Sequence, residues 1–254
     1  MASILDKYGI KEVADVMFYD ITETGAPGKP VLYLDTLKVS TIEQTAQEAT
    51  ANGGKGNAPL IIWDYGKEIN VTLEDALFSA KSMALMFGNG VPSDDTSTLK
   101  KTISWIATSS GAVSSGTGLP TTYEGPQGKS YAVPDSVATY DETGSAVDSV
   151  ESGKTYYSTF DVAITSAATI EVSANSFPGT YYITGDTYAR SEKTGLDEFF
   201  QFIIPKAKVQ SSNTITLQAD GDPSVFSLNL RVLRPAGGGA MMKLVKYDVT
   251  AVNP

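Results

Sequence analysis

The chain has 254 residues, of which 41% are hydrophobic and 19% are charged, and its formal net charge is -10. This length can bury a core in one large domain or two small ones, and this composition is typical of a globular chain and not of a disordered one. Histidine and cysteine are both absent, which excludes Ser-His-Asp and Cys-His catalysis, disulfides, and metal sites built on His or Cys.

The acidic balance also disfavours a nucleic-acid-binding protein, because phosphate contacts need clustered Lys and Arg. The excess is uneven: residues 1–178 hold 22 acidic and 11 basic groups, whereas residues 179–249 hold 7 and 8. Outside any family context, this pattern indicates a solvated acidic surface. No apolar run approaches the length that spans a bilayer, and the N-terminus lacks a signal-peptide pattern, so we expect synthesis in a cytoplasm and no membrane partner.

The first strand is expected at residues 16–21, followed by a turn over residues 22–30. A long strand is predicted at residues 31–42, which are rich in β-branched and aromatic side chains. Residues 43–57 are polar and end in a glycine cluster, so we expect a mobile loop between two long strands. The cluster could cradle a phosphate, but it lacks the Walker spacing that ends in Gly-Lys-Ser/Thr; the alternative is a flexible hairpin tip.

Residues 60–73 alternate between apolar and polar side chains, which is the period of a strand buried on one face. The apolar set, interrupted only by Lys67, comprises Ile61, Trp63, Tyr65, Ile69, Val71 and Leu73. The polar set comprises Asp64, Glu68, Asn70 and Thr72. We predict that these four polar side chains share one face that is wet or lines a channel. Residues 74–87 then show helical spacing, and Gly88 is placed to end a helix.

Residues 102–178 differ in composition, with fourteen Ser and eleven Thr but only two Lys. Short strands are expected at residues 129–133, 155–164 and 168–173, and we interpret the segment as an irregular, exposed β insertion and not as a linker. Its carboxylates lack the spacing of an EF-hand loop, so solvated turns are favoured over a cation site. They are Asp135, Asp141, Glu142, Asp148 and Glu151.

Residues 179–249 consist of strand-like runs separated by turns. Runs at 179–190 and 197–205 flank a polar turn, and runs at 214–219 and 226–232 flank the turn Asp220-Gly-Asp-Pro223. A last run covers residues 241–249. The expected fold is therefore mainly β: an antiparallel sandwich or barrel-like core with one flanking helix and a β-rich insertion.

Several short motifs resemble those of a known family of proteins. In the C-terminal stretch they include Gly185-Asp-Thr-Tyr-Ala-Arg190 and Leu230-Arg-Val-Leu-Arg-Pro235, and nearer the N-terminus Gly53-Gly-Lys-Gly-Asn57. These segments resemble structural proteins of tailed bacteriophages, above all the major tail tube protein. The resemblance implies a tail tube core in two halves, residues 1–101 and 179–254, with residues 102–178 inserted between them.

The same resemblance implies a function. Tail tube subunits form rings of six copies, and stacked rings make the conduit through which DNA is ejected. The implied partners are other copies of the chain, the tape-measure, baseplate and tail terminator proteins, and a sheath where the tail contracts. DNA would pass without specific binding, no enzyme activity, cofactor or metal is expected, and the protein would reside in the virion after assembly in the host cytoplasm.

Two groups of site residues follow from the resemblance. A long hairpin loop that reaches the adjoining ring would comprise Gln44, Glu48, Asn52, Gly53, Gly54, Lys55, Gly56 and Asn57. A lumen-facing group would comprise Asp64, Glu68, Asn70 and Thr72, because acidic and neutral side chains do not retain DNA.

Two alternatives stay open at the level of sequence. The chain could be another virion component, such as a baseplate, decoration or host-surface binding protein. A carboxylate-based glycosidase would instead need two carboxyl groups about 5–10 Å apart in a cleft, which a sequence does not reveal.

Overall fold

The structure is a computed structural model that describes residues 7–88, 93–94, 98–113, 119–134, 137–164, 167–215 and 225–247. The chain divides into two compact units. Unit 1 combines Met1–Pro92 with Ile170–Pro254, and unit 2 is Ser93–Thr169. Both boundaries of the inserted unit lie earlier in the chain than the composition suggested. One reason is that the backbone of Phe177 and Pro178 lies against Gly88, inside unit 1.

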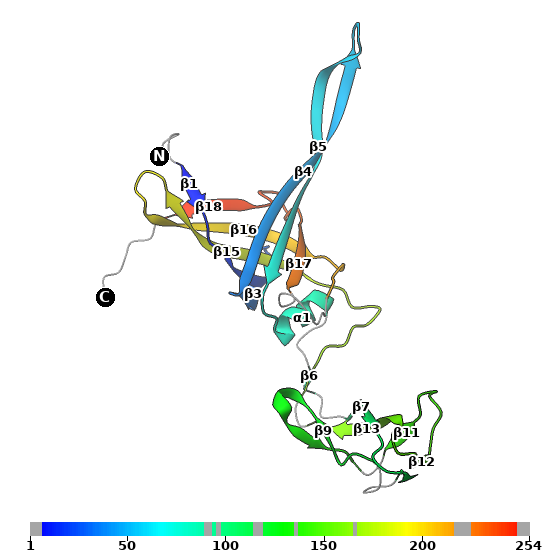
Figure 1. Ribbon diagram of the computed structural model, residues 1–254. Coiled ribbons are helices and arrows are strands. Elements are labelled where there is room, and N and C mark those ends of the chain that lie inside the picture. Colours follow the sequence, from blue (N-terminus) through cyan, green and yellow to red (C-terminus); the bar gives the residue numbers. More distant parts are fainter. Residues whose placement is uncertain are drawn as a thin grey trace, which may run out of the picture. The chain divides into compact units, whose positions relative to one another are not determined.

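The described part of unit 1 contains ten elements, labelled in Figure 1. They are β1 (Tyr8–Ile10), β2 (Asp15–Ile21), β3 (Pro27–Leu34), β4 (Leu37–Gly53), β5 (Ala58–Asp75), α1 (Ala80–Phe87), β15 (Thr180–Ser191), β16 (Asp197–Val209), β17 (Phe226–Val232) and β18 (Lys243–Tyr247). The strands form one antiparallel sheet in the order β3-β2-β15-β16-β17-β5-β4, with β1 added to β15 and β18 added to β16. This arrangement confirms the predicted mainly β, antiparallel fold.

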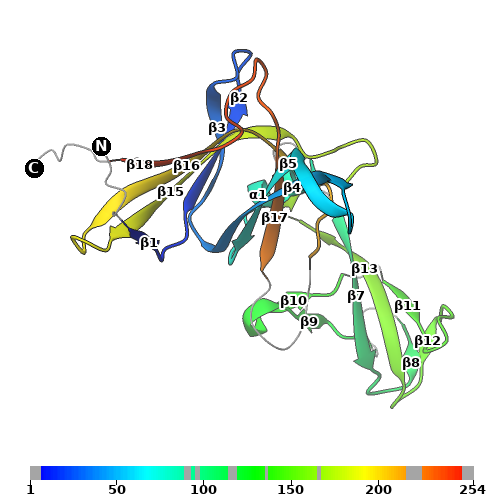
Figure 2. The ribbon, with the colours of Figure 1, turned by 90° about the horizontal axis from the view of Figure 1, so that it is seen from above.

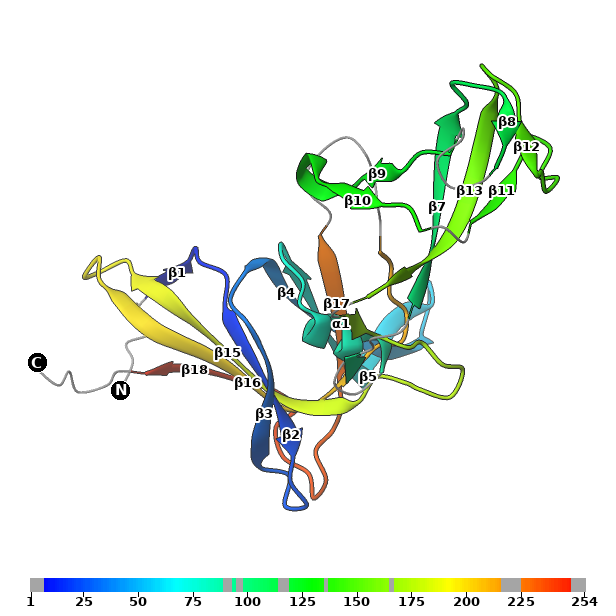
Figure 3. The same cartoon turned by 90° about the horizontal axis from the view of Figure 1, so that it is seen from below.

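The sheet curls strongly, as Figures 2 and 3 show from above and below. Its two edge strands, β3 and β4, are joined by only Asp35 and Thr36. Two residues span about 7–10 Å, so one end of each edge strand must lie close to the other. The concave face therefore encloses a core.

The core of unit 1 forms because alternate residues of most strands are apolar and point inward. Phe18, Leu73, Ile183, Ile204 and Leu230 are completely buried in it. Helix α1 adds Leu85 and Met86 to the same cluster. This packing confirms the inward assignment of Ile69, Val71 and Leu73 on β5.

Helix α1 is shorter than predicted. Strand β5 continues to Asp75, so residues 74–79 are not helical. The helix begins after Ser79, whose hydroxyl accepts a hydrogen bond from the backbone N–H of Ser82 at 3.0 Å, while the Ser82 hydroxyl accepts one from the Ser79 N–H at 2.9 Å. This reciprocal pair satisfies free N–H groups of the first turn. At the other end, Gly88 adopts a left-handed conformation with φ 80, as predicted.

We expect Gly88→Ala to lower the free energy of unfolding of unit 1 by about 2–4 kcal/mol, because left-handed backbone is strained for alanine and the new Cβ would overlap the backbone of Phe177 and Pro178. Gly25→Ala is the matched control: φ is also +80 there, but nothing lies within 4 Å of the new Cβ, so only the strain of about 1–2 kcal/mol is expected. Urea unfolding monitored by circular dichroism measures both. Equal losses in the two variants would contradict the close packing at Gly88.

Two sequence predictions between residues 31 and 57 are wrong. The long strand expected at 31–42 is two strands, because the chain turns at Asp35 and Thr36 between β3 and β4. The mobile loop expected at 43–57 is mostly strand: β4 runs to Gly53 and pairs with β5 along its length. The polar side chains that suggested a loop are instead those of a strand with no core to face, since residues 43–50 are all exposed.

A β-bulge in β5 overturns the prediction that Asp64 shares a face with Glu68, Asn70 and Thr72. Thr45 pairs with Glu68 and Gln47 pairs with Tyr65, so two residues of β5, Gly66 and Lys67, oppose one residue of β4. Gly66 has φ +62, which a bulge of this kind requires. Side chains that are directly opposite lie on the same face, so Tyr65 and Glu68 lie on the same face.

Beyond the bulge, the alternation of β5 is therefore reversed. The side chains of Ile61, Trp63 and Tyr65 lie on the same face as that of Glu68. Asp64 lies on the other face, which it shares with Ile69, Val71 and Leu73.

The C-terminal strands largely follow the prediction. The hairpin of β15 and β16 and the strands β17 and β18 are confirmed. The expected partner run at 214–219 and the turn at 220–223 fall mostly outside the described residues, and Thr214 and Ile215 are not in a strand.

The described part of unit 2 is built from strands and one turn of 3₁₀ helix. They are β6 (Ser93–Asp94), β7 (Thr98–Ile106), β8 (Gly111–Ala112), β9 (Thr122–Glu124), η1 (Pro126–Gly128), β10 (Ser130–Ala132), β11 (Ala138–Tyr140), β12 (Ser149–Val150), β13 (Thr155–Ala163) and β14 (Ala168–Thr169). The largest sheet has the order β11-β13-β7. Strands were expected where β10 and β13 lie, but the run at 168–173 shortens to β14, and β7 was missed because polar and charged residues dominate it.

A small core of its own supports unit 2. Ala107, Val150 and Tyr156 are buried together, and Trp105 packs against them. The indole Nε1 of Trp105 donates to Ser158 Oγ at 2.8 Å, and Ser158 is completely buried. The polar groups of this core are thus paired, which burial demands.

Candidate assembly surface

The outer parts of β4 and β5, residues 44–53 and 58–67, form a two-stranded hairpin that projects from the sheet, and we call this hairpin the arm (Figure 1). Residues 54–57 form its tip, where the Asn57 N–H donates to the Gly54 carbonyl at 3.2 Å. Gly54, Gly56 and Asn57 all have positive φ. The hairpin-tip interpretation of the glycine cluster is therefore confirmed.

One face of the arm is apolar. Ile61, Trp63 and Tyr65 lie on it in a row, and each is 53% exposed. Ala51 and Ala49 lie directly opposite Ile61 and Trp63 on β4, so the row borders a shallow strip of small side chains. Exposed apolar groups arranged in this way on a surface indicate contact with another molecule.

The opposite face of the arm is acidic. Glu48 and Asp64 are directly opposite each other, both exposed, with Thr50 and Ile62 as the next pair toward the tip. Like charges that are directly opposite destabilise a strand pair. The arm therefore has two unlike faces, and each lacks a complementary partner within the described part of the arm.

The predicted inter-ring residues are thus distributed over the arm. Gln44, Glu48 and Asn52 lie on the acidic face of β4, opposite Ile69, Asp64 and Pro59. Gly53 ends β4, and Gly54, Lys55, Gly56 and Asn57 form the tip. The apolar row was missed because unbroken alternation placed it in the core. The signal that could have found it is Gly66, since a glycine inside a strand pattern indicates a bulge.

The predicted lumen-facing residues divide into two places. Glu68, Asn70 and Thr72 share the convex face of the sheet, opposite to the core. Glu68 forms an ion pair with Arg231 of β17, and the Thr72 hydroxyl donates to Asn229 Oδ1 at 3.2 Å. Asp64 lies on the acidic face of the arm instead. The convex face is therefore polar, and its glutamate is already matched by a cation.

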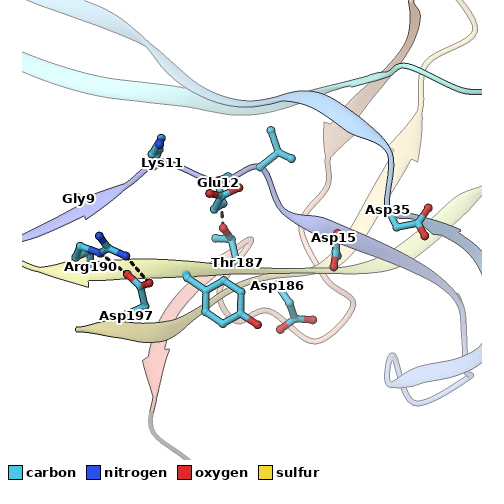
Figure 4. A pocket seen from close by; sticks show the side chains of 11 residues that line it. Gly9, Lys11, Glu12, Asp15, Asp35, Asp186, Thr187, Arg190 and Asp197 are labelled. Carbon is cyan, nitrogen blue, oxygen red and sulfur yellow. Dashed lines mark hydrogen bonds and ion pairs between the residues drawn. The ribbon is translucent and has the colours of Figure 1, made fainter. Parts of the chain in front are cut away.

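A polar hollow of about 610 Å³ lies where the chain leaves the sheet between β1 and β2 (Figure 4). Glu12, Asp15, Asp35 and Asp186 line it. Next to them Arg190 donates to Asp197 through Nε at 2.6 Å and Nη2 at 2.7 Å, as the dashed lines in Figure 4 mark. This hydrogen bond lowers the pKa of Asp197 and raises that of Arg190.

The described residues of the hollow do not have the features of a metal centre. Within the residues that the structure describes, no group of three or more Asp and Glu side chains is placed to hold a metal ion. Asp15 accepts from the Tyr33 hydroxyl at 3.3 Å, and Asp186 accepts from Gln201 Nε2 at 2.7 Å. Desolvation raises the pKa of Tyr33, and Asp15 adds to that effect. Asp15 and Asp186 are thus engaged in surface hydrogen bonds.

The carboxylates of unit 2 also serve local structure. Asp141 Oδ1 accepts from the N–H groups of Thr143 and Ser145, each at 2.9 Å, and from the Thr143 hydroxyl at 2.7 Å; the hydroxyl bond is the main cause of the lowered pKa of Asp141. Glu151 pairs with Lys154 at 2.7 Å. Asp135 lies outside the described residues.

Within the described ranges, no helix is long and apolar enough to cross a membrane. A curled antiparallel sheet, a projecting hairpin with an exposed apolar row and polar groups engaged in local bonds together characterise a structural subunit. The comparison with family models makes that class specific.

The model of the YomU/Tube protein family matches residues 8–244, and the chain belongs to this family of phage-derived tube proteins. Comparison with curated proteins gives no match. Membership makes the chain a structural component of a phage tail and confirms the resemblance at the level of the tube class.

Proposed function

We propose that this chain is the major tail tube protein of its phage, that six copies form a ring, and that stacked rings form the conduit for DNA ejection. The observation that carries the proposal is the apolar row Ile61, Trp63 and Tyr65 on a hairpin that has no core of its own. A two-stranded hairpin is marginally stable in water by itself. Covering the row with another copy stabilises the arm and joins the copies.

Family membership favours another copy of this chain as the molecule that covers the apolar row. A tube is a polymer of one chain, and contacts between two different patches of that chain propagate into rings and open stacks. An arm that leaves its own sheet can reach a neighbouring copy. The row and its alanine strip would then exclude water at the contact, as the buried centre of an interface does.

The convex side of β5 is our candidate for the channel wall. Glu68, Asn70 and Thr72 give this side of the strand neutral and acidic groups. A wall without excess cations does not accumulate phosphate contacts along the tube, so DNA can slide. We assign no enzyme activity and no cofactor to the chain. The proposed partners are its own copies and the tape-measure, baseplate and terminator proteins, with a sheath in a contractile tail.

Electron microscopy of the purified full-length chain tests the proposal. We expect concentration-dependent tubes with a continuous central channel and six-fold symmetry in end views. Light scattering after size-exclusion chromatography gives the mass of the intermediates. A chain that stays monomeric at every concentration, or that forms only closed particles without a channel, would overturn the proposal in favour of a baseplate, decoration or host-surface role.

A further inference from the structure

The acidic face of the arm carries a repulsive pair that the fold does not require. Glu48 on β4 and Asp64 on β5 are directly opposite each other, which sets their Cβ atoms about 4.5–5.5 Å apart. Both side chains are exposed, so the core gains nothing from them. Neither belongs to an ion pair within the described residues.

A second repulsive pair, of opposite sign, lies on the convex face of the sheet. Lys208 on β16 is directly opposite Arg231 on β17, and both are exposed. Arg231 also pairs with Glu68, but Lys208 makes no ion pair with any described residue. The same cross-strand spacing separates the two cations, so the two pairs are complementary in charge and in geometry.

Within one subunit, the Glu48–Asp64 pair and the Lys208–Arg231 pair lie on opposite sides of the sheet. Lys208 and Arg231 lie on the convex face, because their neighbours Ala207 and Leu230 are completely buried on the concave one. Beyond the bulge, the acidic face of the arm continues the concave side of the sheet, because Asp64 lies on the same face as Ile69 and Val71. Only a second copy can therefore bring the carboxylates onto the cations.

We propose that the acidic face of the arm docks on the Lys208–Arg231 pair of a second copy of this chain. The inference rests on the proposed tube function and names the surface that receives the arm. In the docked state Asp64 and Glu48 would each approach a cation, and both repulsions would be relieved. The apolar row on the other side of the arm is then left for a further neighbour, so one arm would bind between two copies.

Charge reversal with reciprocal rescue tests this pairing. The variants of the full-length chain are Glu48→Lys with Asp64→Lys, Lys208→Glu with Arg231→Glu, and all four changes together. Sedimentation and electron microscopy give the concentration at half-maximal tube formation. We expect each double variant to raise this concentration by about tenfold or more, because close charge pairs at interfaces couple strongly. The fourfold variant should restore it to within about threefold of wild type.

Neutral variants guard against a folding artefact, because a carboxylate introduced in place of Arg231 would face Glu68. Lys208→Gln with Arg231→Gln should also weaken assembly while circular dichroism and the monomer elution volume stay as in wild type. Assembly by all variants as by wild type, or no rescue in the fourfold variant, would overturn this pairing and leave the proposed function standing. Failure of wild type itself to assemble counts against the proposed function instead.

Discussion

Removal of the arm is expected to give a folded subunit that forms no tubes. Thr45 and Glu68 are directly opposite partners, so residues 46–67 can be replaced by an Asn-Gly turn that closes the shortened hairpin. The deleted residues are almost all exposed, and the core of unit 1 keeps Ile69, Val71 and Leu73. The thermal midpoint should therefore stay within a few degrees of wild type.

A finer variant separates the apolar row from the arm as a whole. The triple variant with Ile61→Ser, Trp63→Ser and Tyr65→Ser should form no tubes visible by electron microscopy, because each subunit would lose three apolar contacts with a neighbouring copy. Leu99→Ser is the matched control: Leu99 is 61% exposed, comparable to the 53% of the row, but lies on β7 of unit 2, outside the arm. We expect the control to retain tubes. Tubes of normal length from the armless chain would refute the role of the arm.

The second large effect concerns the core of unit 1. Leu228 is 2% exposed at the centre of β17, and Leu228→Ala should lower the free energy of unfolding by about 2–5 kcal/mol because a cavity remains. Phe202→Ala should cost about 3–5 kcal/mol for the same reason. Urea unfolding followed by circular dichroism provides the measurement.

Removal of most of unit 2 is the control for that prediction. Asp94 and Ala168 are cross-strand partners, so an Asn-Gly turn can replace residues 95–167. Unit 2 has a small core of its own, and we expect its loss to change the stability of unit 1 by less than about 1 kcal/mol. If this excision lowered the yield of soluble protein as much as Leu228→Ala does, the assignment of two separate units would be wrong.

The sequence predicted best where alternation and burial coincide. Strands β2, β15 and β17 bury alternate residues over much of their length, so the pattern of period two identified them. Gly88 ended the helix as expected, because a left-handed residue there strongly favours glycine. The beginning of the helix was less predictable, since Ala76 and Leu77, which suggested a helix over 74–79, belong to the chain that follows β5.

The arm could not be predicted in the same way, because no core constrains it. Residues 43–57, which form most of β4 and the tip, hold no large apolar side chain, and in sequence this resembles a loop. In β5 the apolar row has the parity of the core strand, and only Gly66 reveals that the faces exchange. Simple alternation therefore placed Asp64 and Glu68 on one surface, whereas the bulge places them on opposite faces.

The bulge at Gly66 also limits how the arm can change during evolution. Losing one residue of β5 between the bulge and Trp63 would transfer every side chain from there to the tip to the opposite face, because strands alternate with a period of two. Such a deletion would move Ile61 and Trp63 to the acidic face, beside Glu48, in a single step. Among relatives that use the same surfaces, we expect the spacing from the bulge to the aromatic row to be constant, and the tip to grow or shrink by even numbers of residues in each strand.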